Sequence, residues 1–290
     1  MLQEVVDDFV ASLASEGVER AGGSHNTRMA YRNDLGQLCT YMLKQGITTW
    51  SEVTPDHLLT YISSMREGQV YRPATIARKL AAFRTFFRYL GYEERIKEDP
   101  TVDILLPPIV RGVPHVLNTT QINVLFRLAE QDTPFGLRDF AMLHLLYATG
   151  IRTSELVALD LNQYQREHGF IHCSGVRGRS EQDRCLPLTP AAVDAMENYL
   201  LHGREWFLRS FGEPALFLNH RGERLSRQGF WLIIKGYARR AGIHDLTPHR
   251  LRHSFTLLML NNGMEVESIQ ELLGHVHLST TQIYCQLIQA

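Results

Sequence analysis

Apolar residues recur at helical spacing in several segments of the first third of the chain. The first predicted helix spans residues 2–15. The second begins at Ser24 or Asn26, either of which can cap it, and ends near Lys44. A third begins at Thr54-Pro55-Asp56, where a capping side chain precedes a proline in the first turn.

The fourth predicted helix runs from Pro73 to Leu90 and combines an apolar face with many cations. Its aromatic and aliphatic residues are expected to face the core, and its basic residues to lie elsewhere. The inward set is Ile76, Leu80, Phe83, Phe86 and Phe87, and the other set is Arg78, Lys79, Arg84 and Arg88. The four helices together predict a small all-α domain over residues 1–105.

Residues 98–116 interrupt this periodicity with Pro100, Pro107, Pro108 and Pro114. Proline ends helices and stiffens a connection between domains. We therefore place a linker at residues 106–116, followed by a second domain over residues 117–290.

The second domain alternates helical patterns with short runs typical of strands. A helix cap at Asn118 opens it, and a buried helix from Phe135 to Tyr147 ends at Gly150. Strands are predicted at residues 169–174 and 184–188 around a polar turn, with a further short strand at residues 215–218. Other helices are predicted over residues 190–207 and from Ser226, Pro248, Val266 and Ser279. The predicted fold class is mainly α, with two domains, the second being mixed α with a small antiparallel sheet.

The composition also indicates the cellular compartment of the protein. The first residues are acidic and amphipathic, which is not typical of a signal peptide, and no apolar run approaches the ~20 residues of a membrane helix. Four scattered cysteines, Cys39, Cys173, Cys185 and Cys285, form no Cys-x-x-Cys pair. Reduced thiols and a cytoplasmic location, away from membranes, are expected.

The net charge of −1 does not by itself indicate a protein that binds nucleic acid. The local distribution of charge is more informative, because residues 68–92 contain no acid and residues 220–252 contain eight basic residues against Glu223 and Asp245. Either segment could face phosphates, or could be an ordinary charged helix surface. The candidate DNA-binding residues of the first segment are Arg72, Arg78, Lys79, Arg84 and Arg88.

The candidate chemistry lies in the second domain. Arg152 occurs in Thr149-Gly-Ile-Arg-Thr-Ser-Glu, His249 and Arg252 in His-Arg-Leu-Arg, and His275 at the end of Leu-Leu-Gly-His, with Tyr284 nine residues later. Guanidinium groups bind phosphate oxygens two at a time, and imidazoles move protons near neutral pH. A tyrosine hydroxyl can attack phosphorus and hold the product covalently.

In these motifs and their order, the sequence resembles the tyrosine recombinase family, most closely its Xer-type and integrase-like members. The resemblance implies that Arg152 binds the scissile phosphate. Glu155 lies one helical turn further on, so it could brace Arg152 or form an ordinary surface pair with it. The resemblance implies the same phosphate-binding role for Arg252 and His275, proton transfer by His249 and nucleophilic attack by Tyr284. The first domain is then a core-DNA-binding domain and the second the catalytic domain. His253 is expected to be structural.

The hairpin departs from the family pattern. Relatives carry a lysine there that protonates the leaving 5′ oxygen, whereas residues 174–184 contain none, and Arg177 is the nearest counterpart, with Arg179 second. Arginine binds phosphate well but gives up a proton poorly. The acid is therefore left open among His249, a water and Lys235. Only six residues follow Tyr284, so the helix with which relatives dock on a neighbouring protomer is expected to be absent, replaced or truncated.

The resemblance implies a site-specific DNA recombinase that cuts and rejoins strands through a 3′-phosphotyrosine, without ATP, metal or another cofactor. It also implies a double-stranded DNA target, assembly of four protomers on DNA, and exchange through a Holliday junction. Two alternatives stay open: strand relaxation as in type IB topoisomerases, and a catalytically impaired DNA-binding relative with an accessory or regulatory role. A zinc site at His275 and His277 is disfavoured, because no third ligand has suitable spacing. The target sequence and the biological task, whether dimer resolution, integration or transposon resolution, are not predicted.

Overall fold

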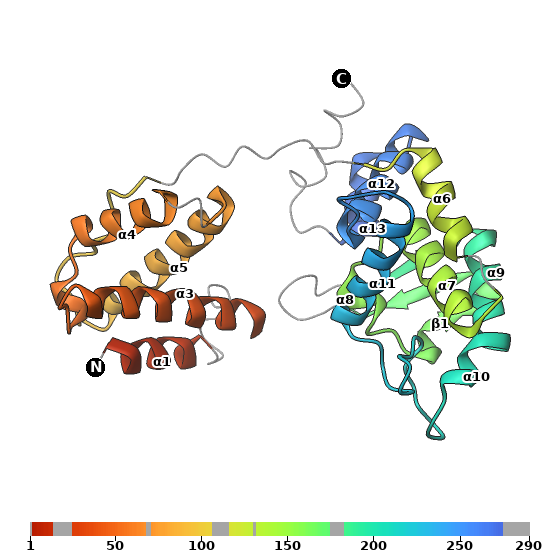
Figure 1. Cartoon of the computed structure of the whole chain (residues 1–290), viewed down its shortest axis with the longest axis horizontal. Helices are drawn as coiled ribbons and strands as arrows, with labels where there is room; N and C mark the ends of the chain where they lie inside the picture. Colours follow the sequence, from red (N-terminus) through yellow and green to blue (C-terminus); the bar gives the residue numbers. More distant parts are fainter. Residues whose placement is uncertain are drawn as a thin grey trace. The chain divides into compact units, whose positions relative to one another are not determined.

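The structure is a computed structural model that describes residues 2–13, 25–67, 71–105, 116–129, 132–174 and 183–274. The chain divides into two compact units, Met1–Arg111 and Gly112–Ala290 (Figure 1). Most of the predicted linker lies outside the described residues. Within them, no helix is long and apolar enough to cross a membrane.

The N-terminal unit is built from the helices that the sequence predicts. The 3-10 turn η1 buries Trp50, whose indole Nε1 donates to the Leu2 carbonyl at 3.0 Å. The last of the helices supplies the centre of the core, because Phe83, Phe86 and Phe87 are all buried. The elements are α1 (Leu2–Ser12), α3 (His25–Lys44), η1 (Trp50–Glu52), α4 (Pro55–Glu67) and α5 (Pro73–Tyr92).

Lys79 on α5 corrects the prediction for this helix. Instead of lying away from the core, it is buried, and its Nζ pairs with Asp34 of α3 at 3.0 Å and donates to Gln37 at 2.6 Å. Asp34 is fully enclosed, and a buried carboxylate requires a partner of opposite charge. The pattern of apolar residues on α5 contains no sign of this partner on α3.

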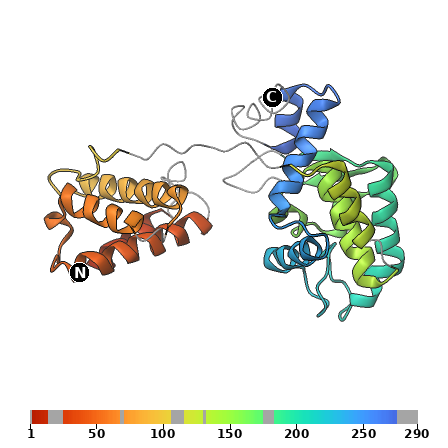
Figure 2. The same cartoon turned by 45° about the horizontal axis from the view of Figure 1, so that its top comes forward.

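The C-terminal unit is organised around α7 (Pro134–Thr149). Thr133 caps this helix through its Oγ1, which accepts from the Gly136 N–H at 3.1 Å, and Gly150 ends it in the left-handed conformation. The helices α6 (Thr119–Ala129), α9 (Pro190–Asn198) and α12 (Pro248–Asn261) all pack on α7. Both ribbon views place α6 and α9 beside it (Figures 1 and 2). α7 is therefore buried on most of its surface.

The sheet has three antiparallel strands in the order β1-β2-β3. β2 (Phe170–Cys173) and β3 (Arg184–Pro187) confirm the two strands predicted around the hairpin, with His172 opposite Cys185. The short β1 (Tyr164–Gln165), paired with β2, was not predicted.

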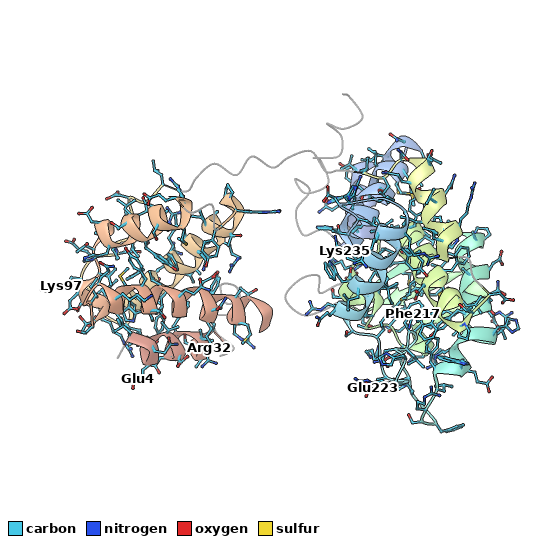
Figure 3. All side chains as sticks on the ribbon, viewed as in Figure 1. Glu4, Arg32, Lys97, Phe217, Glu223 and Lys235 are labelled. Atoms are coloured by element: carbon cyan, nitrogen blue, oxygen red, sulfur yellow. The ribbon has the colours of Figure 1, made fainter. Side chains whose placement is uncertain are left out.

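The segment 215–218 was predicted as a strand and is not one. It makes only isolated bridges, from Ala215 to Asp160 and from Leu218 to Arg224. Side chains take the place of a neighbouring strand: Arg204 donates to the Ala215 carbonyl, Tyr199 to the Leu216 carbonyl, and Arg138 to the Leu218 carbonyl. Phe217, between them, lies inside the unit (Figure 3). The apolar run at residues 215–218 therefore predicted burial correctly, but it did not predict correctly that the segment pairs as a β-strand.

The remaining helices begin close to where they are predicted. The helical stretch of residues 190–207 is interrupted by a π-helical turn, η4 (Tyr199–Gly203), before α10 (Arg204–Phe207). The others are α8 (Thr153–Leu156), α11 (Arg227–Arg240) and α13 (Val266–Leu273). The helix predicted from Ser279 lies outside the described residues.

Candidate active site

α12 presents His249 and Arg252 on one face. Thr247 caps the helix by accepting the Arg250 N–H at 3.1 Å, and Pro248 occupies the first turn, where a missing N–H costs nothing. Residues three apart share a helix face, so the imidazole and the guanidinium lie on the same side. Local sequence signals therefore fix where this motif sits.

Arg152 lies at the start of α8, two residues after the helix-ending Gly150. Glu155 holds it twice: Oε2 accepts the Arg152 backbone N–H at 2.9 Å, and Oε1 pairs with Nη1 at 2.9 Å. The Arg152 side chain remains 23% exposed. It can therefore meet a ligand without leaving its carboxylate partner.

The C-terminal end of α13 gathers three arginines on three successive carbonyls. Leu272 accepts from Arg184 Nε at 3.1 Å, Leu273 accepts from Arg252 Nη2 at 2.5 Å, and Gly274 accepts from Arg152 Nη2. Unpaired carbonyls and the helix dipole make this end attractive to cations. The three guanidinium groups come from β3, α12 and the start of α8, so this helix end assembles residues that are distant in sequence.

Two glycines make this assembly possible. Gly150 and Gly274 have φ of 58° and 61°, and each ends a helix in the left-handed conformation that side chains disfavour. A Cβ on Gly274 would lie 2.9 Å from Arg184 Nη1 and 3.1 Å from Arg152 Nη1. The carbonyl of Gly150 accepts from Arg252 Nη1. Each glycine therefore lets its carbonyl hold an arginine of the site.

Arg184 is a member of this cluster that the sequence did not reveal. Its Nη2 pairs with Glu155 Oε2 at 2.7 Å, so Glu155 is shared between Arg152 and Arg184. Burial alone would raise the pKa of Glu155, but the hydrogen bonds and charges of Arg184 and Arg152 outweigh it and hold that pKa below its ordinary value. The glutamate is therefore ionised at neutral pH. Position at the foot of the hairpin was the only available signal for Arg184.

The histidines of α12 are held in the neutral form. Burial, followed by the charges of Arg252 and Arg152, lowers the pKa of His249. The rings of His249 and His253 stack with centroids 4.5 Å apart. Burial, His249 and Arg252 lower the pKa of His253 to about 4. A neutral imidazole can accept a proton, so His249 has the form that a general base requires.

Three of the predicted site residues, Arg177, His275 and Tyr284, lie outside the described residues, as do Arg179 and His277. In the sequence, His275 directly follows Gly274, whose carbonyl accepts from Arg152. Lys235, the other candidate acid, lies on α11 with its Nζ 5.5 Å from the centre of the Trp231 ring (Figure 3).

The predicted basic residues of the N-terminal unit differ in their surroundings. Arg72 and Arg88 are exposed, and Arg84 donates to the Ile104 carbonyl. Arg78 pairs with Asp34, with its side chain 45% exposed, whereas Lys79 is enclosed. Arg72, Arg78 and Arg88 are therefore exposed on the surface of this unit, whereas Arg84 is half-buried.

The arrangement in the C-terminal unit suits an anion better than a metal. Among the described parts of the chain, no three His, Cys, Asp or Glu side chains lie together as a metal site. Arg152, Arg184 and Arg252 carry three positive charges against the single charge of Glu155. A surplus of positive charge with one partly exposed guanidinium favours a phosphate.

Both units match families of known proteins. Residues 115–290 match the phage integrase family, and residues 6–94 match the phage integrase N-terminal SAM-like domain. The chain is 45% identical over 284 residues to tyrosine recombinase XerC of Herpetosiphon aurantiacus, covering 98% of this chain and 90% of that protein. It is 39% identical over 287 residues to tyrosine recombinase XerD of Listeria monocytogenes, covering 98% and 94%.

Solved structures share the fold. The crystal structure of XerA recombinase is 26% identical with a TM-score of 0.51, and the match covers 98% of this chain and 93% of that one. The Tn1549 transposon integrase in complex with transposon right end DNA has a TM-score of 0.80 at 17% identity, with 98% and 94% covered.

Proposed function

The chain belongs to the phage integrase family and acts as a tyrosine-type site-specific DNA recombinase, and we propose that it cuts and rejoins DNA strands through Tyr284. The observation that carries the assignment of the site is the end of α13, where Arg152 and Arg252 are held by neighbouring carbonyls. Two guanidinium groups fixed in this way match the two non-bridging oxygens of a phosphodiester.

In the proposed reaction, Arg152 and Arg252 bind the scissile phosphate and stabilise the charge that builds on its oxygens during attack. His275 contributes a further contact to the same phosphate. Because their positions are fixed by backbone carbonyls and by Glu155, the arginines need little reorganisation when the phosphorane forms.

Tyr284 is the proposed nucleophile. Its hydroxyl oxygen forms a bond to phosphorus while the bond to the 5′ oxygen breaks, and the product is a 3′-phosphotyrosine with a free 5′ hydroxyl. A phenol has a pKa near ~10, so its proton must be removed at neutral pH. His249 accepts this proton, which its lowered pKa allows because the ring is neutral. The 5′ hydroxyl of a partner strand then reverses the reaction.

The leaving 5′ oxygen must gain a proton, and the donor is a separate part of the proposal. Arg177 is the counterpart of the family's hairpin lysine, and we assign it to binding phosphate because a guanidinium donates a proton poorly. The acid is then His249 carrying the tyrosine proton, a water or Lys235.

Double-stranded DNA is the proposed partner. The Tn1549 integrase, which shares this fold, was solved in complex with transposon right end DNA. The exposed arginines of α5 supply positive charge on the other unit. Assembly of four protomers on two duplexes completes the proposal and rests on the family resemblance. The relatives named above are recombinases and give no support to an impaired accessory protein.

The test uses a DNA site with a nick just beyond the scissile phosphate, from which the released fragment diffuses away and traps the covalent adduct. Wild-type protein should form an adduct that survives denaturing electrophoresis. Tyr284→Phe should bind the same DNA and form none, since only the attacking oxygen is lost. Tyr92→Phe, at an exposed position of the N-terminal unit, is the matched control and should form the adduct normally. A normal adduct yield in Tyr284→Phe would remove this residue as the nucleophile.

A further inference from the structure

We propose that Arg184, at the start of β3, is a positioning residue for this reaction that sets Arg152 through Glu155 and the end of α13. The inference rests on the proposed function, because it gives Arg184 a part in the same chemistry. It adds a residue outside the motif of arginines, histidines and tyrosine, and it connects the foot of the hairpin to the phosphate-binding arginines.

The contacts of Arg184 define its role. Its Nε donates to the Leu272 carbonyl at 3.1 Å, and its Nη2 pairs with Glu155 Oε2 at 2.7 Å. The planar fork of one guanidinium therefore fixes a helix end and a carboxylate at the same time. Both anchored groups lie beside Arg152: Glu155 itself pairs with Arg152 Nη1, and the Gly274 carbonyl, two residues after Leu272, accepts from Arg152 Nη2.

The side chain of Arg184 is more enclosed than that of Arg152. Its side chain is 8% exposed, whereas that of Arg152 is 23% exposed. Its remaining nitrogen, Nη1, is buried and has no hydrogen-bond partner in the part of the chain that the structure describes. Arg252 is buried as well, and it is the contacts of Arg184, with Nε on the Leu272 carbonyl and Nη2 on Glu155, that set it apart. Arg184 therefore acts through its neighbours.

Charge gives this placement a second consequence. Glu155 is shared between two guanidinium groups, so the trio of Arg152, Arg184 and Glu155 carries one net positive charge. Without Arg184, the Glu155 carboxylate would neutralise Arg152 alone, and the remaining pair would present no net charge to a phosphate. Arg184 therefore keeps Glu155 ionised and in place while leaving Arg152 able to attract an anion.

A double-mutant cycle tests whether Arg184 acts through Glu155. Adduct formation on nicked DNA is timed at saturating protein for wild type, Arg184→Met, Glu155→Gln and the double variant. We expect each single change to slow the adduct by roughly tenfold or more, as for the loss of a charged hydrogen bond. The double variant should be no slower than the slower single variant, because both remove one linked unit. Effects that multiply would overturn the inference.

A conservative pair of variants separates positioning from general stability. Arg184→Lys keeps the charge but loses the fork, so it should recover part of the rate that Arg184→Met loses. Arg204→Lys is the matched control, because Arg204 is also buried and donates to the carbonyls of Glu213 and Ala215, away from the site. Per folded molecule, Arg204→Lys should cleave at the wild-type rate. An equal loss in both lysine variants would reduce Arg184 to a structural residue.

The titration of Glu155, followed by carbon NMR of its carboxyl group in the free full-length protein, supplies a readout that does not depend on cleavage. Removing Arg184 should raise the pKa of Glu155, since burial then acts against fewer stabilising charges. The carboxylate should protonate as the pH falls, and the Arg184→Met variant should lose cleavage at a higher pH than wild type. An unchanged titration overturns the inference. If wild-type protein itself forms no adduct, the proposed function fails and the inference fails with it, whereas a normal wild-type adduct with an unaffected Arg184→Met refutes the inference alone.

Discussion

Within the described residues, each unit of the molecule contains a carboxylate that is shared by two cations. In the N-terminal unit Asp34 pairs with Arg78 and Lys79, and in the C-terminal unit Glu155 pairs with Arg152 and Arg184. In both, one cation is enclosed and the other is partly exposed. We call these the Asp34 cluster and the Glu155 cluster.

The two clusters differ in what else holds the cations. Lys79 is fixed by side chains: Asp34 and Gln37 of the neighbouring α3, and the Tyr71 ring, whose centre lies 5.0 Å from its Nζ. Arg152 and Arg184 are also fixed by backbone carbonyls at the end of α13. Backbone carbonyls of a helix end position a guanidinium without neutralising its charge. The Asp34 cluster therefore joins two helices, while the Glu155 cluster keeps a surplus charge available for a ligand.

Removing the carboxylate from each cluster gives the largest expected contrast. Asp34→Asn leaves Lys79 buried beside a neutral side chain, and breaking a buried pair in this way costs about 3–5 kcal/mol. Glu155→Gln should destabilise its unit less, because its arginines keep their carbonyl partners, and should mainly slow cleavage. Hydrogen exchange of the amides of α3 and α5 in the full chain measures the first effect.

The control for this prediction is Asp7→Asn. Asp7 pairs with Arg32 at 3.1 Å, and both side chains are about half exposed. Such surface pairs contribute roughly 0–1 kcal/mol. If Asp34→Asn costs no more than Asp7→Asn, Lys79 is not held as a buried charge, and the comparison between the clusters loses its basis.

The next largest effect should distinguish the partly exposed Arg152 from the buried Arg252 of the catalytic unit. Arg152→Ala and Arg252→Ala should each lower the rate of adduct formation by roughly 10²–10³-fold, which is typical of losing one donor to the transition state. Arg252→Ala should also lower the melting temperature, because Arg252 is buried and joins the carbonyls of Gly150 and Leu273. Cleavage near the wild-type rate in either variant contradicts its assignment to the phosphate.

Sequence patterns located most of the elements because the signals involved are local. Thr247 and Pro248 mark the start of α12, and the spacing of His249 and Arg252 then places both on one face. Gly150 marks the end of α7 in the same way. Caps, prolines and glycines act within a few residues, so they can be interpreted without knowing the tertiary structure.

The features that were missed depend on contacts between distant segments. Lys79 lies three residues after Ile76 and four before Phe83, on the buried face of α5, and its charge is matched there by Asp34 of α3. Arg184 joins the site because β3 passes the end of α13, nearly ninety residues later in the chain. The segment 215–218 makes only isolated bridges, and arginine and tyrosine side chains bind three of its carbonyls. None of these partners can be identified from periodicity.

The smallest expected effect concerns the cations of the N-terminal unit and the salt dependence of DNA binding. Arg72 and Arg88 are exposed, so they are free to meet phosphates, whereas Lys79 is enclosed. Each phosphate contact that is lost should reduce the slope of log affinity against log salt by roughly 0.9. We expect Arg72→Gln and Arg88→Gln to flatten the slope and leave the free energy of unfolding nearly unchanged. Lys79→Gln should leave the slope unchanged and lower the free energy of unfolding, because it removes a buried partner of Asp34 and no surface charge.

Arg95→Gln provides the matched control for this measurement. Arg95 follows α5 and pairs with Asp8 at 3.5 Å on the surface of the same unit, so its loss removes a positive charge outside the predicted set. Its salt slope should equal that of wild type, measured on the same duplex over the same range of salt. If Arg95→Gln flattens the slope as much as Arg88→Gln, the salt dependence of binding reflects the total charge of the unit and not contacts made by the predicted residues. If Lys79→Gln flattens it, Lys79 becomes exposed on DNA, and the Asp34 cluster then shares the ligand-binding role of the Glu155 cluster.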